Sequence, residues 1–182
     1  MTQSNLCRTA LAAALTLAPF ACKRKVEQTV QTPTVEEEAA APRMASTVRM
    51  NDPQVASQLG AGFYPVEGNA WRWAARQFSV TLRPPDGAAQ KGCVLELDLT
   101  VPDPVIDKLH SVTLTGVVEG NKLAPETYSK SGAYSYKRDV TPSMITGDSV
   151  KVDFSLDKAM APSGAERREL GVVVNAVSLG PK

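Results

Sequence analysis

Carboxylates are the side chains of this sequence that could carry catalysis without a cofactor. A glycosidase uses two carboxylates on either side of the scissile bond, and these meet in space rather than in sequence. Five acidic residues could supply such a pair: Glu67, Glu96, Asp98, Glu166 and Glu169. Glu96 and Asp98, however, alternate with apolar residues, which is typical of solvent-facing positions on a strand. Nothing else in the sequence favours hydrolysis, so we expect that the protein is not an enzyme.

Sites built on histidine, cysteine or phosphate-binding loops are not favoured either. His110 is the only histidine, and no second cysteine lies near Cys93 in the sequence. A metal site needs several ligands, and a reactive thiol needs a setting that stabilises the thiolate. The sequence also has no glycine-rich phosphate loop and no serine in a nucleophile elbow. We therefore expect no metal and no cofactor, and we interpret Cys93 as a core residue.

The charge balance limits the possible partners. The 182 residues include 20 basic and 19 acidic side chains, which gives a formal net charge of +1. Binding to nucleic acid requires a clustered basic surface, and no basic cluster occurs after the first 45 residues. We expect no nucleic acid as a partner. With 43% hydrophobic residues, the chain is long enough for one packed domain and an extension.

The first 21 residues are typical of a secretory signal. Arg8 is their only charged residue, and an apolar stretch follows from 9 to 21. This stretch is shorter than the roughly 20 residues that span a bilayer, and Pro19 interrupts it, so a retained transmembrane helix is less favoured. Ala21-Cys22 resembles the processing site of bacterial lipoproteins. The resemblance implies that residues 1–21 are a lipoprotein-type signal peptide and that Cys22 is lipidated. The open alternative is an ordinary cleavage after Ala18.

Lipidation would place the protein in the cell envelope. Acyl chains hold a protein on a membrane by burying methylene groups, at about 0.8 kcal/mol each. Lys23 follows the cysteine, where family knowledge associates an aspartate with retention in the inner membrane. The resemblance therefore implies an exported protein whose N-terminal lipid anchors it to the outer membrane. Residues 22–45 are polar and carry two prolines, which is typical of a flexible tether, a disordered N-terminal arm.

Residues 46–182 show the patterns of an all-β domain. Asp52 and Pro53 begin a short predicted helix that ends at Gly60. Apolar residues then alternate with polar ones in the following predicted strands: 71–73, 78–83, 93–101, 112–118, 134–137 and 150–157. A last strand at 168–179 is apolar on both faces, which predicts a central position in a sheet. Roughly eight short strands without crossover helices predict an antiparallel β-sandwich.

Two segments resemble the beginning and the end of jelly-roll domains of bacterial envelope proteins, which are similar to galactose-binding-like carbohydrate modules. The first is the aromatic stretch 62–73, and the second is Glu-Arg-Arg-Glu-Leu-Gly at 166–171. The resemblance covers residues 60–180 and implies a non-catalytic module that binds an envelope glycan. Trp71 is the candidate stacking residue, and Arg72 and Tyr64 are the candidate polar and aromatic partners.

A structural interpretation of the same residues remains open. The tryptophans could fill the core, and Arg168 and Glu169 could form an ion pair that fixes the last strand. The protein would then be a structural or assembly component of the envelope with another envelope protein as its partner. A scaffold needs an exposed apolar patch, whereas a glycan-binding module needs an exposed aromatic platform. Burial of Tyr64, Trp71 and Trp73 would favour the scaffold.

Overall fold

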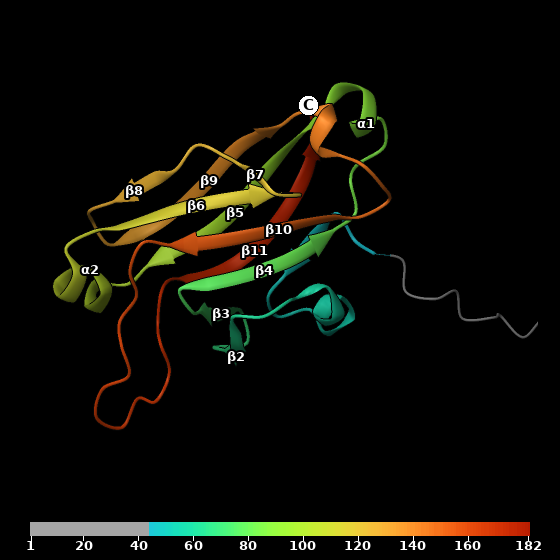
Figure 1. Cartoon of the computed structure of the whole chain (residues 1–182). Helices are drawn as coiled ribbons and strands as arrows, with labels where there is room; N and C mark the ends of the chain where they lie inside the picture. The colour runs from blue at the N-terminus through green and yellow to red at the C-terminus, as the bar shows by residue number, and fades with distance from the viewer. Residues whose placement is uncertain (1–43) are drawn as a thin grey trace, which may run out of the picture. The chain divides into compact units, whose positions relative to one another are not determined.

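The computed structural model describes residues 44–182, which form two antiparallel β-sheets packed face to face (Figure 1). The six-stranded sheet contains β1 (Thr47–Arg49), β2 (Phe63–Glu67), β3 (Trp71–Ala74), β5 (Cys93–Val101), β9 (Gly132–Val140) and β11 (Val173–Pro181). The five-stranded sheet contains β4 (Gln77–Leu82), β6 (Val112–Val118), β7 (Asn121–Lys122), β8 (Glu126–Tyr128) and β10 (Val150–Leu156). The predicted signal peptide and the lipidation of Cys22 lie outside the described residues, as does nearly all of the predicted tether.

The order of the strands is that of a jelly roll. The chain passes to the other sheet at every step from β3 to β6, and again at every step from β8 to β11. The order β3-β11-β5-β9 in one sheet therefore faces the order β4-β10-β6-β7 in the other, and all recorded strand pairs are antiparallel. Figure 1 shows β4, β10 and β6 lying over β5, β11 and β9. The predicted antiparallel β-sandwich of jelly-roll type is confirmed.

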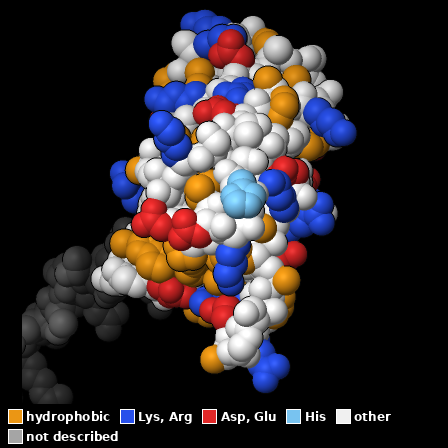
Figure 2. All heavy atoms as spheres, turned by 90° about the vertical axis from the view of Figure 1, so that its left-hand side faces the viewer, with side chains coloured by type: hydrophobic (Ala, Val, Ile, Leu, Met, Phe, Trp, Pro, Cys, Tyr) orange, Lys and Arg blue, Asp and Glu red, His pale blue; other side chains and the backbone are white. Residues whose placement is uncertain are grey.

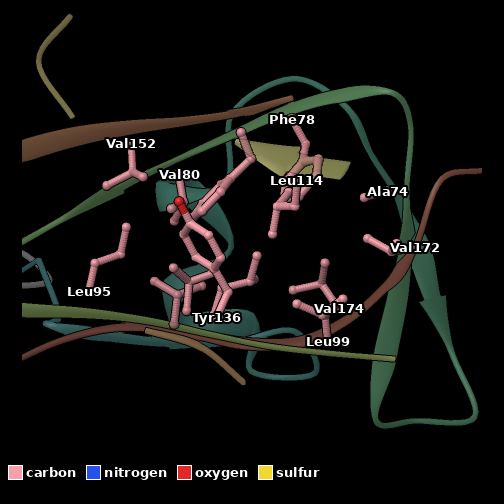
Figure 3. Packing of buried hydrophobic residues seen from close by; sticks show 14 of the residues in the cluster. Ala74, Phe78, Val80, Leu95, Leu99, Leu114, Tyr136, Val152, Val172 and Val174 are labelled. Atoms are coloured by element: carbon pink, nitrogen blue, oxygen red, sulfur yellow. The ribbon is translucent and has the colours of Figure 1, made fainter. Parts of the chain in front are cut away.

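The alternation of apolar residues places the core between the sheets. On β5 and β10 the odd and even positions separate cleanly: Cys93, Leu95, Leu97, Leu99, Val150, Val152, Phe154 and Leu156 are buried. Their polar neighbours point outward, as strand geometry requires. Figure 3 shows Tyr136 of β9 extending from one layer toward Val152 and Val80 of the other. Its hydroxyl group donates to Ala124 O at 2.8 Å and accepts from Gly116 N at 3.2 Å, so this buried polar group is paired.

The last strand lies inside its sheet, as predicted, but it begins later. β11 pairs with β5 along one edge and with β1 and β3 along the other. The predicted start at residue 168 is wrong, because residues 168–172 do not pair with β5. Gly171 instead packs against Leu156 and against the backbone of Ala74, where a Cβ atom would find no room. Gly171 N donates to Ala74 O and Ala74 N donates to Val172 O, both at 2.8 Å, so the segment runs beside β3 before β11 begins to pair with β5.

The helices are short. The predicted helix after Asp52 is a 3-10 helix, η1 (Pro53–Gln58), and Asp52 caps it by accepting a 2.8 Å hydrogen bond from Gln54 N. The remaining helical segments are α1 (Ala88–Lys91), α2 (Asp103–Leu109) and η2 (Pro142–Met144). The sequence patterns did not lead us to predict α2, although Pro104 in its first turn is a helix-start signal. Within residues 44–182, none of the helices has the length and apolar character needed to cross a membrane.

The position of the core predicts that two adjacent residues of β10 contribute very differently to the free energy of unfolding. Phe154 stacks on Phe78 with ring centroids 5.1 Å apart, whereas Asp153 points outward. Replacing Phe154 by Ala should lower the free energy of unfolding by about 3 to 5 kcal/mol, because a buried ring leaves a cavity. Replacing Asp153 by Ala should cost less than about 1 kcal/mol. Denaturant unfolding followed by circular dichroism measures both values, and similar costs for the two variants would contradict the observed strand parity.

Candidate functional site

The candidate site is built on the hairpin of β2 and β3. The two strands are joined by Gly68, Asn69 and Ala70, and the φ angles of the first two, 56° and 53°, are those of a tight hairpin turn. Ala70 N donates to Glu67 O at 3.2 Å to close the turn, and Asn51 Nδ2 donates to Asn69 O at 3.1 Å. The turn is thus held from inside the hairpin and from the segment after β1. Side chains on this hairpin therefore occupy defined positions.

Three aromatic side chains gather on the hairpin, and none is fully buried. Trp71 and Trp73 lie on the same side of β3 with ring centroids 6.4 Å apart and planes at 82°, an edge-to-face contact. Tyr64 on β2 is also half-buried. Tyr64 and Trp73 pack partly on the hydrophobic core, whereas Trp71 is not part of that cluster. Of the three rings, Trp71 therefore contributes least to the packing of the hydrophobic core.

Arg168 connects the segment before β11 to this hairpin. Its Nη1 donates to Glu67 Oε1 at 2.6 Å, across 101 residues of sequence. Its Nε and Nη2 donate to the two carboxylate oxygens of Glu166 at 2.9 and 2.8 Å, a bidentate arrangement. The guanidinium carbon also lies 5.2 Å from the centre of the Tyr64 ring, which is within cation–π distance. One arginine thus fixes two carboxylates and covers one aromatic ring.

The predicted ion pair of Arg168 with Glu169 is wrong in its partner. Arg168 binds Glu67 and Glu166, while Glu169 Oε2 accepts a hydrogen bond from the backbone nitrogen of Arg76 at 3.0 Å. The physical reason is geometric, because adjacent side chains in an extended segment point to opposite sides. Both residues still fix the entry to the last strand, each through a different neighbour.

Arg72 is anchored to backbone. Its Nε donates to Met50 O at 2.9 Å and its Nη1 donates to Tyr64 O at 3.0 Å. Trp71 and Arg72 are consecutive on β3, so their side chains leave opposite faces of the strand. The structure therefore brings Tyr64 and Trp71 to one hairpin but does not place the Arg72 guanidinium beside the Trp71 ring. The bonds of Arg72 hold the residues after β1 and the strand β2 against β3.

The electrostatics of the Arg168 network do not suit acid catalysis. The hydrogen bonds from the Arg168 side chain and backbone lower the pKa of Glu166 to about 2. The same contacts, with that of Glu67, raise the pKa of Arg168. A glycosidase needs one carboxyl group with a raised pKa that can donate a proton at neutral pH. Glu166 therefore stays ionised at neutral pH. Its hydrogen bonds with Arg168, which also binds Glu67, form a structural network.

Cys93 and His110, which the sequence also offered as candidates for chemistry, occupy positions that serve the fold. Cys93 is fully buried, and burial raises the pKa of its thiol, which disfavours the reactive thiolate. His110 ends α2 with a positive φ of 65°. In the part of the chain from 44 to 182, no three His, Cys, Asp or Glu side chains are grouped so that they could hold a metal ion.

The hairpin itself was missed in the sequence, although a signal was present. Gly68-Asn69 is a two-residue turn pair of the kind that connects antiparallel strands, and aromatic residues flank it. The contact of Glu67 with Arg168 had no local signal, because it joins residues 101 positions apart.

Comparison with known proteins gives matches among solved structures alone. No protein-family profile and no curated protein matches the chain. Matching structures include the carbohydrate-binding module TmCBM27, studied for specific mannan recognition, with a TM-score of 0.44 and 12% identity over 76% of this chain and 97% of that one. The CBM36-1 domain of a multidomain xylanase from the hindgut metagenome of Trinervitermes trinervoides has a TM-score of 0.43 and 9% identity, covering 75% of this chain and 96% of its own. A CBM4 structure has a TM-score of 0.33 and 9% identity, covering 81% and 93%. Similarity at this level says nothing about what this chain binds.

The Arg168 network predicts an unusual titration of Glu166. Because the folded-state pKa is lowered, the ion pair is complete above the ordinary glutamate pKa of about 4.3 and is lost as the pH falls toward 2. Arg168→Gln should raise the Glu166 pKa, though not fully to the ordinary value, because Arg168 N also donates to Glu166 Oε1. The carboxyl carbon resonance of Glu166, followed by NMR against pH, measures this shift. Arg167→Gln is the matched control, and an equal shift in both variants would contradict the network.

Proposed function

We propose that residues 46–182 form a non-catalytic module that binds a glycan of the bacterial cell envelope through the β2–β3 hairpin. The observation that carries the proposal is the half-exposed position of Trp71, which contacts Trp73 and shares with Tyr64 a hairpin held by the bonds of Arg72 and Arg168. A sugar ring has an apolar face that can stack on an indole, while its hydroxyl groups need fixed hydrogen-bonding partners. Both requirements meet on this surface.

Polar atoms near the Trp71 ring can form hydrogen bonds with the hydroxyl groups of a sugar. Glu67 lies opposite Trp71 in the strand register and binds Arg168 through Oε1, which leaves Oε2 as an acceptor. No hydrogen bond recorded for residues 44–182 uses the indole nitrogen of Trp71, which lies beside Gly68. A donor and an acceptor thus flank the ring, as polar groups do in ligand sites that fix orientation.

The hairpin is ordered before any ligand arrives. The two bonds of Arg72 and the three side-chain bonds of Arg168 already restrict the strands that carry the aromatic rings. A ligand that binds to an ordered surface loses less free energy in fixing side chains. A shallow surface with few contacts should still bind one or two sugar units weakly, so affinity would rise with the length of the glycan.

The distribution of exposed hydrophobic groups supports a binder over an assembly scaffold. Among residues 44–182, Val66 is the large hydrophobic residue that stands out as exposed, at 40% relative exposure. Figure 2 shows that hydrophobic side chains below and to the left of the single histidine are bordered by acidic side chains. A protein–protein scaffold would need a larger apolar patch. The scaffold role remains the alternative if no glycan binds.

The envelope location is a separate part of the proposal, and it depends on the leader. Lipidation of Cys22 and cleavage before it would leave residues 22–45 as the connection between the membrane and the folded module. The module would then reach glycans near the outer membrane while its acyl chains hold it in place.

Glycan binding should depend on Trp71. The full chain, solubilised in a detergent without a sugar headgroup, would be screened against envelope polysaccharides, including peptidoglycan fragments and lipopolysaccharide O-chains. Trp71→Ala should weaken binding at least about tenfold, because one central stacking residue often supplies 1.4 kcal/mol or more. Trp71→Phe keeps a ring and should retain part of the affinity.

Circular dichroism must show that both variants are folded. Absence of binding across the panel, or unchanged binding in a folded Trp71→Ala variant, would remove this site and leave the assembly role.

Membrane attachment should depend on Cys22. Cys22→Ser should release the protein from the membrane fraction, because serine offers no thiol for the acyl chains. Mass spectrometry of the mature N-terminus provides the direct measurement. A free amine at a different first residue would show that the lipoprotein interpretation is incorrect.

A further inference from the structure

A shallow groove lined by both polar and apolar atoms lies on the outer face of the five-stranded sheet. It encloses about 330 Å³ and crosses β4 and β10. Its lining consists of Ala61, Gln77, Phe78, Ser79, Val117, Lys151, Asp153, Phe154 and Ser155. Trp71 and Trp73 belong to the six-stranded sheet, so the groove and the hairpin lie on different sheets of the sandwich.

Strand parity aims the polar side chains of this groove outward. Phe78, Val152 and Phe154 fill the core, so Ser79, Asp153 and their alternate neighbours leave the opposite face. The register places the polar side chains in rows, in which Asp153 lies beside Ser79 and Ser155 lies beside Gln77. Neighbouring strands are about 4.8 Å apart, so each row presents closely spaced polar groups.

The groove offers hydrogen bonds that the protein itself does not use. Among the hydrogen bonds recorded for residues 44–182, none involves the side-chain amide of Gln77 or the hydroxyl groups of Ser79 and Ser155. Lys151 and Asp153 pair with each other at 2.8 Å, so their charges compensate. This differs from the hairpin, where Arg168 engages the nearby carboxylates. The groove is therefore rich in donors and acceptors and has no net charge.

One wall of the groove is a segment that lies flat against β4. Gly60 N donates to Ser79 O at 2.8 Å, and Ser79 N donates to Ala61 O at 3.1 Å. Gly60 and Gly62 allow this approach, because a Cβ atom at either position would collide with β4. Gly62 also has a φ of 92°, which side chains disfavour. The floor and this wall are thus fixed by backbone hydrogen bonds, and the groove exists before a ligand binds.

We propose that this groove is a second glycan-binding surface, which takes a neutral, polyhydroxylated chain without an aromatic stacking residue. The chemistry selects this class. The paired charges of Lys151 and Asp153 attract neither an anionic polymer nor a cationic one. Hydroxyl groups both donate and accept, and so do the amide and hydroxyl groups that line the groove. The inference goes beyond the hairpin site, and it gives the module two contact surfaces.

NMR titration of the isotope-labelled full chain, in a detergent without a sugar headgroup, tests the inference. The probes are linear hexasaccharides of glucose, of galactose and of N-acetylglucosamine, with hexagalacturonate as the anionic comparison. At least one neutral probe should shift the backbone amides of residues 77–79 and 153–155. The same shifts should appear in Trp71→Ala. The Gln77→Ala, Asp153→Ala double variant should weaken the groove interaction at least about tenfold, while Lys122→Ala on the same sheet should leave it unchanged.

The two sites can be separated, because both tryptophans of the chain lie on β3. Tryptophan fluorescence therefore reports on the hairpin, and the amide shifts report on the groove. Groove shifts without a fluorescence change would support the second surface independently of the hairpin. Absence of groove shifts with all three neutral probes, equal binding by the folded double variant, or stronger shifts with hexagalacturonate would overturn the inference.

Discussion

Strand β11 is the element on which the rest of the six-stranded sheet depends. It pairs with β5 along one edge, and along the other edge it pairs with β3 at its beginning and with β1 near its middle. Without β11, the hairpin of β2 and β3 would have no connection to β5 and β9 in this sheet. Because β11 is also the last strand in the sequence, the sheet can be completed only after the whole domain is available. Non-local pairing of this kind makes folding slow relative to helical domains.

The candidate site inherits its order from this arrangement. Arg168 lies just before β11 and binds Glu67 on the hairpin, so the pairing of β11 with β3 brings the two ends of the site together. The charged groups at the hairpin are largely used to hold the structure, which leaves the aromatic ring of Trp71 with the smallest internal role. The groove over β4 and β10 differs in both respects. Its polar side chains have unused hydrogen-bonding capacity, and no aromatic ring is exposed between them. The two surfaces therefore differ in the kind of contact that they could offer.

The sequence predicted the strands that alternate cleanly, and it failed where the decisive contacts are distant or the elements are short. β5, β6 and β10 each carry an apolar residue at every second position, and a single buried face imposes that pattern. α2 has seven residues and only Val105 fully buried, so it leaves little periodicity. The partner of Arg168 could not be derived, because a side chain 101 residues away leaves no trace in the local pattern. The turn at Gly68-Asn69 was readable, and its two positive φ angles explain why these residue types occur there.

The segment beside β4, which includes Gly60 and Ala61, affects whether copies of the protein can pair edge to edge. β4 is an edge strand, and its backbone groups would be open to pairing with another chain. Instead, Gly60 and Ala61 bond to Ser79, Gln58 Nε2 donates to Thr81 O at 2.8 Å, and Arg83 N donates to Ala45 O at 3.0 Å. This edge is therefore capped along most of its length by the residues that precede the hairpin. Molecules crowded on a surface would be protected there from joining strand to strand into aggregates.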